Sequence, residues 1–255
     1  MMFEVTLNRE IHFITENQER GRHFIMKKIL ILCTMLLMVG CSNIKVLDPK
    51  SVTGKEQAYL IWLSIALMSI VIIVVFTLFT WFVIKYRHTT ARKGTLPIDV
   101  KGNTKLELTY TIIPIFILLI LAVPTVKITL DQSPSTEASI EQEGTHINVG
   151  AKQFEWSFEH PNGKKEVDEL VLPEGEPLIF HLQSEDVIHS FWIPELAGKV
   201  DVFPHKELTY VIKDADMGTY DGKCAEFCGI QHGNMTFSVK VVSKEDYEDY
   251  LQDNN

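Results

Sequence analysis

The feature that most restricts how this chain can fold is a run of 25 residues without a charge, Leu60–Ile84. A helix of that length rises about 37 Å and can cross a hydrocarbon core of about 30 Å. A second uncharged run, Tyr110–Val126, is shorter and contains Pro114 and Pro124, and we expect it to span the membrane too. The sequence therefore predicts a transmembrane hairpin with helices at about 60–84 and 110–126.

The loop between these runs indicates the orientation of the hairpin. Its basic residues outnumber its acidic ones: Lys85, Arg87, Arg92, Lys93, Lys101 and Lys105 against Asp99 and Glu107. Such loops stay in the cytoplasm, so both outer ends of the hairpin are predicted to be extracytoplasmic. Trp62 and Trp81, near the ends of the first run, fit anchoring at the membrane interfaces.

The N-terminal region resembles a bacterial lipoprotein signal. Lys27 and Lys28 precede a short apolar stretch that ends at Gly40 and Cys41, and this basic, apolar and small-residue order is typical of a secretory signal. We expect translation to start at Met26, residues 1–40 to be removed, and Cys41 to carry the lipid. The alternative is a short buried helix. If the signal is removed, residues 41–130 form the hairpin domain and residues 131–255 form an extracytoplasmic domain.

Beyond residue 130 the hydrophobic period changes from helical to two. Apolar side chains alternate with polar ones in four segments, which are residues 153–158, 178–182, 208–212 and 237–241. Short alternating segments separated by Pro and Gly predict an antiparallel all-β sandwich or small barrel. Ser243 followed by acidic residues predicts a closing helix over residues 243–251.

The charge of this outer domain excludes one class of partner. Residues 131–255 hold 9 Lys and Arg against 25 Asp and Glu, a net charge of −16. Such a surface repels phosphate, so we expect no nucleic-acid partner. An acidic face suits a cationic protein partner instead.

Two cysteines point to metal chemistry in the outer domain. Cys33 would leave with the signal and Cys41 would take the lipid, so Cys224 and Cys228 remain, and His232 and Met235 follow within 12 residues of Cys224. Two thiolates, an imidazole and a thioether form a soft ligand set that suits copper. A disulfide is the alternative favoured by an oxidising compartment, and a Cys2His2 zinc site would need a ligand from afar.

The second cysteine distinguishes this loop from a single-copper blue site, which uses one Cys, two His and a weak Met. Two bridging thiolates can hold two copper ions, and each ion then needs its own imidazole. His189, flanked by apolar residues, is the best candidate for the second imidazole. The other histidines of the domain are predicted to be surface residues: His146, His160, His181 and His205.

Taken together, residues Cys41–Leu251 resemble subunit II of haem-copper respiratory oxidases of the cytochrome c oxidase type, in the lipoprotein form of Gram-positive bacteria. The resemblance implies a cupredoxin-like fold and a dinuclear copper A centre. It implies that Cys224 and Cys228 bridge both coppers and that His189 and His232 bind one each. Met235 would complete the coordination of one ion and the backbone carbonyl of Glu226 that of the other. The Glu226 side chain would reach a Mg2+ site shared with subunit I.

The resemblance also implies a role in electron transfer rather than bond-making catalysis by this chain. The centre would accept electrons from cytochrome c and pass them to haem in subunit I, where oxygen is reduced to water and protons are pumped across the plasma membrane. Phe154 stands where many family members carry the Trp thought to admit the electron, which leaves Trp156 as the other candidate. The chain contains no Cys-x-x-Cys-His motif, so the donor is expected to be a separate protein.

Three rival functions follow from the same residues. A nitric oxide reductase of the superfamily could use a nearly identical copper A subunit. A quinol oxidase subunit would be structural, and quinol-oxidising relatives lose these ligands. A copper-delivery lipoprotein would not need a second transmembrane helix.

Overall fold

The computed structural model describes residues 44–87, 100–135 and 143–253, together with residue 28. The signal segment apart from residue 28, the cleavage position and Cys41 lie outside these residues, as do residues 88–99 of the basic loop between the two apolar runs. A short 3-10 helix, η1 (Lys45–Leu47), precedes the hairpin.

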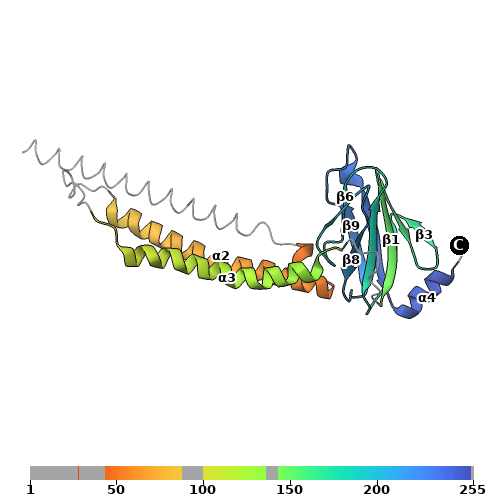
Figure 1. Ribbon diagram of the computed structural model, residues 1–255, viewed down its shortest axis with the longest axis horizontal. Helices are drawn as coiled ribbons and strands as arrows, with labels where there is room; N and C mark the ends of the chain where they lie inside the picture. Colours follow the sequence, from red (N-terminus) through yellow and green to blue (C-terminus); the bar gives the residue numbers. More distant parts are fainter. Residues whose placement is uncertain (1–27, 29–43, 88–99, 136–142, 254–255) are drawn as a thin grey trace, which may run out of the picture. The chain divides into compact units, whose positions relative to one another are not determined.

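Two long helices form the hairpin, α2 (Val52–Tyr86) and α3 (Thr104–Gln132), and they run side by side (Figure 1). Both are long and apolar enough to cross a membrane, with mean hydropathies of 2.8 and 2.4 over their most apolar windows and none of those windows buried. The side chains of Ser51 and Asn103 cap them by accepting hydrogen bonds from backbone amides of the first turn.

The helices are longer than the apolar runs that predicted them, because polar turns continue α2 before Leu60 and α3 on both sides of its apolar run. Gln57 donates a hydrogen bond to the Gln132 side chain across 2.7 Å, and Gln132 donates one to Glu56 across 2.6 Å. These contacts join the start of α2 to the end of α3 and satisfy side chains that would be costly to bury alone.

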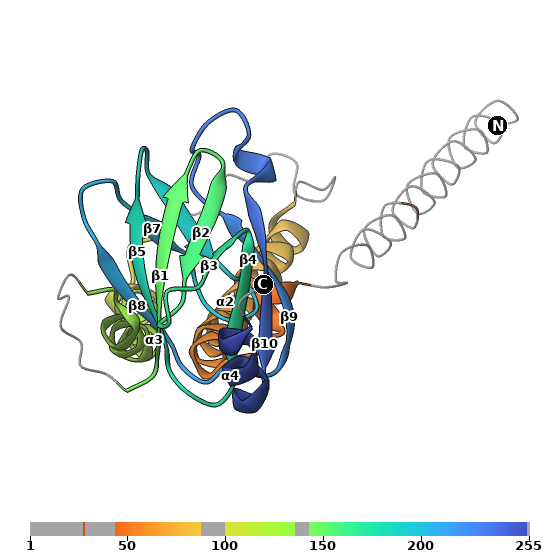
Figure 2. The same ribbon diagram turned by 90° about the vertical axis from the view of Figure 1, so that its right-hand side faces the viewer.

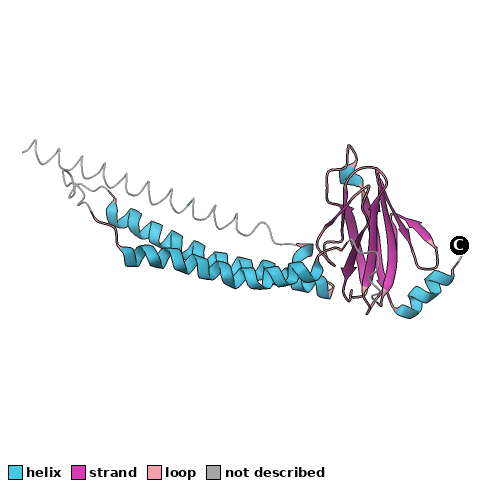
Figure 3. Cartoon of the chain, viewed as in Figure 1, coloured by secondary structure: helices cyan, strands magenta, loops and turns pink. Residues whose placement is uncertain are grey.

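The β-domain consists of two five-stranded sheets that together give the predicted cupredoxin-like sandwich (Figures 2 and 3). The first sheet has the order β3-β2-β1-β5-β8, with strands β1 (Thr145–Lys152), β2 (Glu155–Glu159), β3 (Lys165–Val167), β5 (Leu178–Ser184) and β8 (Leu208–Ile212). The second has the order β4-β10-β9-β6-β7, with strands β4 (Glu169–Pro173), β6 (His189–Trp192), β7 (Val200–Val202), β9 (Gly218–Cys224) and β10 (Thr236–Val242).

The predicted antiparallel pairing is only partly right. β1 pairs with β5 in parallel, and β10 pairs with β4 in parallel, whereas the other named pairs are antiparallel. The predicted closing helix is confirmed as α4 (Lys244–Gln252), with the side chain of Ser243 accepting a hydrogen bond from the amide of Asp246.

Aromatic side chains from both sheets fill the core. Trp156 of β2 is fully buried, and its ring centroid lies 5.7 Å from that of Phe191 and 5.5 Å from that of Phe237. The rings of Phe191 and Phe237 are nearly parallel at 5.2 Å. This core holds β6, β9 and β10 in place, and these three strands carry or adjoin the cysteines, histidines and methionine of the predicted site.

Candidate metal centre

The predicted ligands come from two strands of the second sheet and from the loop that follows one of them. His189 begins β6, Cys224 ends β9, and the loop from β9 to β10 carries Cys228, His232 and Met235. Strand pairing sets Phe191 opposite Cys224. The backbone amide of Cys224 also donates a hydrogen bond to the carbonyl of Met235 across 2.9 Å, so both ends of the loop are held together.

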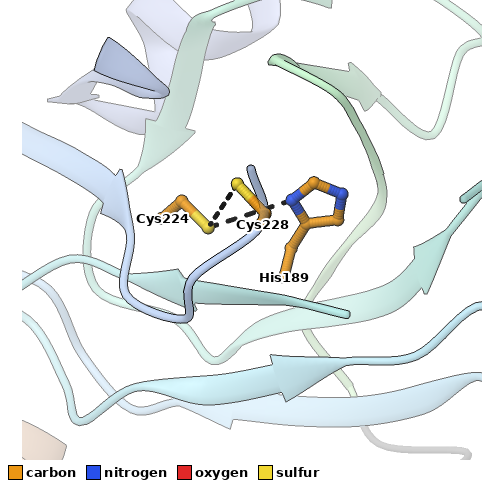
Figure 4. Close-up of side chains that lie close together, drawn as sticks. All are labelled: His189, Cys224 and Cys228. Carbon is orange, nitrogen blue, oxygen red and sulfur yellow. Dashed lines mark hydrogen bonds between the residues drawn. The ribbon is translucent and has the colours of Figure 1, made fainter. Parts of the chain in front are cut away.

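The predicted donor atoms converge, as Figure 4 shows for His189, Cys224 and Cys228. The Sγ atoms of Cys224 and Cys228 are 3.8 Å apart, and both cysteines are free. A disulfide requires about 2.05 Å, so the two thiols are not joined. The ligand atoms of His189, Cys224 and Cys228 all lie within 4.8 Å of one another, and all three residues are buried.

The remaining predicted donors lie beside the two sulfurs. His189 Nδ1 is 3.9 Å from the Cys224 Sγ, and His232 Nδ1 is 3.6 Å from the Cys228 Sγ. The Met235 sulfur is 3.7 Å from the Cys228 Sγ, and the backbone carbonyl of Glu226 is 3.2 Å from the Cys224 Sγ. The structure thus brings together each of the six residues that the sequence singled out as ligands.

Burial disfavours the charged form of the Cys228 thiol. It raises the pKa of the Cys228 thiol to about 11, and the neighbouring Cys224 adds to the rise. Without a cation beside it, this thiol is therefore neutral at pH 7. A bound metal ion would reverse the preference, because thiols coordinate as thiolates and release their protons on binding.

Asp186 holds His189 in place, although no role was predicted for this residue from its sequence context. Its carboxylate lies 2.8 Å from His189 Nε2 and accepts hydrogen bonds from the backbone amides of Gln153 and Val187. Burial by itself would raise the pKa of Asp186, but these hydrogen bonds outweigh burial and keep the pKa below its usual range. A carboxylate that accepts from one ring nitrogen leaves the other, Nδ1, facing the sulfurs.

Gln153 links this carboxylate to the cysteine loop, and it too was missed. Its backbone amide donates to Asp186, and its side-chain amide donates to the carbonyl of Cys228 across 2.6 Å. Gly229 lies beside it with φ at +137°, and a Cβ there would come within 2.9 Å of the Gln153 side chain and 3.1 Å of the Phe154 ring. Only glycine fits this position without strain.

The two residues considered for admitting an electron differ in exposure. Trp156 is fully buried, and its ring centroid is 6.1 Å from that of His189. Phe154 is partly buried and packs on the rim of the core. The burial of Trp156 agrees with the alternative that this residue is part of the sandwich core.

Exposed apolar side chains surround the cysteine loop. Phe227 and Ile230 are 78% and 95% exposed. Phe227 lines a hollow of about 610 Å3, together with Val187, Ile188, Asp201, Phe203, Glu226, Cys228 and Gly229. The Glu226 carboxylate lies 3.6 Å from the Lys199 ammonium, and its side chain is 46% exposed.

One prediction about the other histidines is wrong. His160, predicted to lie at the surface, is only 2% exposed, because α4 covers it and the hydroxyl of Tyr247 lies 2.9 Å from its Nδ1. Polar neighbours in sequence do not reveal that a distant helix will pack over a residue.

Two membrane-type helices joined to a β-sandwich with clustered soft donors define a membrane-attached cupredoxin-like protein. Comparison with known proteins gives the family. Residues 162–242 match the family model described as cytochrome c oxidase subunit II, periplasmic domain. The chain belongs to the subunit II family of haem-copper oxidases.

The relatives carry two kinds of name. Cytochrome c oxidase subunit 2 of Alkalihalophilus pseudofirmus is 37% identical over 224 residues, which are 85% of this chain and 65% of that protein. In Bacillus subtilis, cytochrome c oxidase subunit 2 is 34% identical over 88% of this chain and 67% of its own length, and quinol oxidase subunit 2 is 32% identical over 88% and 70%. The chain thus spans about two thirds of the length of these relatives.

Among solved structures, the periplasmic domain of subunit II of cytochrome oxidase from Bradyrhizobium japonicum is similar to this chain. It is 25% identical, with a TM-score of 0.42, over 45% of this chain and 95% of that domain. The family assignment rests on the sequence relatives.

Proposed function

We propose that this chain is the electron-accepting subunit of a cytochrome c oxidase and that its β-domain holds a dinuclear copper A centre. One observation carries the proposal. Two free thiols lie 3.8 Å apart, and the nitrogens of two imidazoles and the sulfur of a thioether each lie within 4 Å of one of them. The relatives include subunits of both cytochrome c and quinol oxidases. Because quinol-oxidising relatives are expected to lack these ligands, the complete donor set supports a cytochrome c oxidase subunit over a quinol oxidase subunit.

The donor set fits copper. Two sulfurs that share an ion at about 2.3 Å each lie at most about 4.6 Å apart, so a spacing of 3.8 Å accommodates shared ions without rearrangement of the loop. Thiolate, thioether and imidazole are ligands that copper prefers. Copper held there supplies one-electron redox chemistry.

The surrounding residues keep the donors still. Cys224, Cys228, Met235 and His189 are each at most 5% exposed, so water is largely excluded from this side of the site. Asp186 fixes the ring of His189, and Gln153 ties that carboxylate to the cysteine loop. A rigid, dry cage lowers the reorganisation that accompanies a change of charge.

The proposal extends to the partners. Cytochrome c would deliver electrons from outside, and haem in subunit I would receive them for the reduction of oxygen to water coupled to proton pumping. Phe154, on the rim, is the better placed of the two aromatic candidates to meet the donor, since Trp156 is buried. The half-exposed Glu226 carboxylate is available to a Mg2+ ion shared with subunit I.

The proposal also covers the membrane arrangement. Residues 1–40 would be a signal, residues 41–130 the hairpin anchored through a lipid on Cys41, and residues 131–255 the extracytoplasmic copper domain. The two membrane-type helices support the attachment to the plasma membrane.

Metal stoichiometry tests the proposed function. The full chain, purified in detergent and loaded with copper, should hold two copper ions and show the seven-line hyperfine pattern of a mixed-valence pair. Cys224→Ser and Cys228→Ser should each abolish that pattern, because one thiolate cannot bridge two ions. His205→Ala, at an exposed histidine, is the matched control and should retain it. A chain without copper would be a structural subunit of the quinol oxidase kind.

A further inference from the structure

Two histidines on the outer face of the first sheet form a second cluster, separate from the cysteine loop. His146 of β1 and His181 of β5 are neighbours because these strands pair in parallel. His146 Nδ1 lies 2.9 Å from His181 Nε2, and the two ring planes are 13° apart with centroids at 5.3 Å. Neither histidine takes part in the proposed copper centre.

A carboxylate orients one of the rings. His181 Nδ1 lies 3.4 Å from the Glu207 carboxylate and 3.4 Å from the Thr209 hydroxyl, and the side chain of His181 is only 18% exposed. When Glu207 accepts from Nδ1–H, the lone pair of His181 stands on Nε2, facing His146. Histidines that bind metals are held in this way by a carboxylate behind the ring.

We propose that His146 and His181 bind a divalent metal ion, Zn2+ or Cu2+, with Glu207 as the residue that positions His181. Two nitrogens at about 2.0–2.1 Å from one ion are about 2.9 Å apart at a right angle and about 3.3 Å apart at the tetrahedral angle. The observed 2.9 Å is within this range. Imidazole nitrogen suits both ions. Binding displaces the proton between the two nitrogens, and the neutral His146 ring then carries its proton on Nε2, exchanged through solvent, so that Nδ1 is left with a lone pair for the ion.

The surroundings admit a cation. A cavity of about 700 Å3 is lined by His181 and Glu207, so an ion can reach the site from the His181 side. The charged residues that line it are Glu159, Glu185, Glu207 and Lys165. Three carboxylates against one ammonium favour a positive ion there.

Titration with Zn2+ tests the site. The full chain in detergent is used with Cys224→Ser and Cys228→Ser together, which removes the thiol ligands, and calorimetry should find one Zn2+ ion bound per chain. His146→Asn and His181→Asn should each lower the affinity at least tenfold. Glu207→Gln should lower it about 10- to 100-fold, as loss of a supporting carboxylate does. His205→Asn, at an exposed histidine two residues from Glu207, is the control and should leave the affinity unchanged.

A Cu2+ probe reports the ligands directly. In the same chain, electron paramagnetic resonance should show splitting from two nitrogens, and His146→Asn should reduce it to one. A wild-type chain loaded with copper and then titrated with Zn2+ repeats the test if the serine variants fail to fold. Absence of Zn2+ binding in both chains, or equal affinity in His146→Asn, would overturn the proposal and leave a hydrogen-bonded histidine pair.

Discussion

Acidification should destabilise the β-domain through one buried imidazole, that of His160. Its Nδ1 lies 2.9 Å from the hydroxyl of Tyr247 on α4, and its Nε2 is buried without a hydrogen-bond partner in the described part of the chain. Burial lowers its pKa from 6.5 to about 4, with a smaller opposing effect of Glu166 and a lowering effect of Lys164. The native state therefore keeps this ring neutral where the unfolded chain protonates it.

The sign and size follow from these two values. Above pH 6.5 neither state binds the proton, and the stability is at its full value. As the pH falls from 6.5 towards 4, the unfolded state gains a proton that the native state refuses, so the free energy of unfolding drops by about 1.4 kcal/mol per pH unit. The loss reaches roughly 2 kcal/mol at pH 5 and at most about 3 kcal/mol below pH 4.

Urea unfolding of residues 131–255 at pH 7 and pH 5 measures this loss. Other groups also titrate in that interval, so the informative quantity is the difference between the wild type and His160→Gln, whose amide stays neutral. The wild type should lose about 2 kcal/mol more than the variant. His205→Gln, at an exposed histidine, should behave as the wild type. Parallel pH dependences of the wild type and His160→Gln would refute the reasoning.

Four further predictions concern the metal centre and the membrane. Met235→Leu should keep both coppers and raise the reduction potential, because a weak thioether ligand affects the potential of the copper more than its affinity. Complete copper loss in metal analysis would contradict this. Asp186→Asn should weaken copper binding about 10- to 100-fold in a competition titration, and an unchanged affinity would show that the carboxylate does not support His189. Reduction by a basic cytochrome c in stopped flow should slow several-fold as salt rises, because residues 131–255 carry a net charge of −16; a rate indifferent to salt would argue for an apolar contact. Intact mass should show a mature chain beginning at an acylated Cys41, and Cys41→Ala should leave a longer form; an unmodified wild-type chain from Met1 or Met26 would contradict the lipid anchor.

The sequence predicted elements whose pattern is local. Phe237, Val239 and Val241 alternate with polar residues, and they form β10 with their side chains buried. The charge-free runs likewise identified α2 and α3. The parallel pairing of β1 with β5 was not predictable in this way, because it joins Ile147 to Phe180 across 33 residues and leaves no mark in the alternation of either strand.

The same distinction applies to the candidate site. Cys224, Cys228, His232 and Met235 share one loop, so their spacing alone indicated a ligand set, and they do lie together. Asp186 escaped notice although it is three residues from His189, since an aspartate in a turn is most often solvated. The available signal in the sequence was Ser184, two residues before Asp186. Its hydroxyl contacts both the amide and the carboxylate of Asp186, as in an ordered turn.

The backbone hydrogen bond from Cys224 to Met235 separates the folding of the sheet from the metal-binding role of the loop. It closes the loop at its base, where β9 and β10 already pair, so the pairing of these two strands does not depend on the metal-ligating side chains of the loop. Substitutions there can remove or restore donor atoms while the sandwich stays folded. A scaffold that keeps its strand pairing when donor atoms change is compatible with both names found among the relatives, cytochrome c oxidase subunit 2 and quinol oxidase subunit 2.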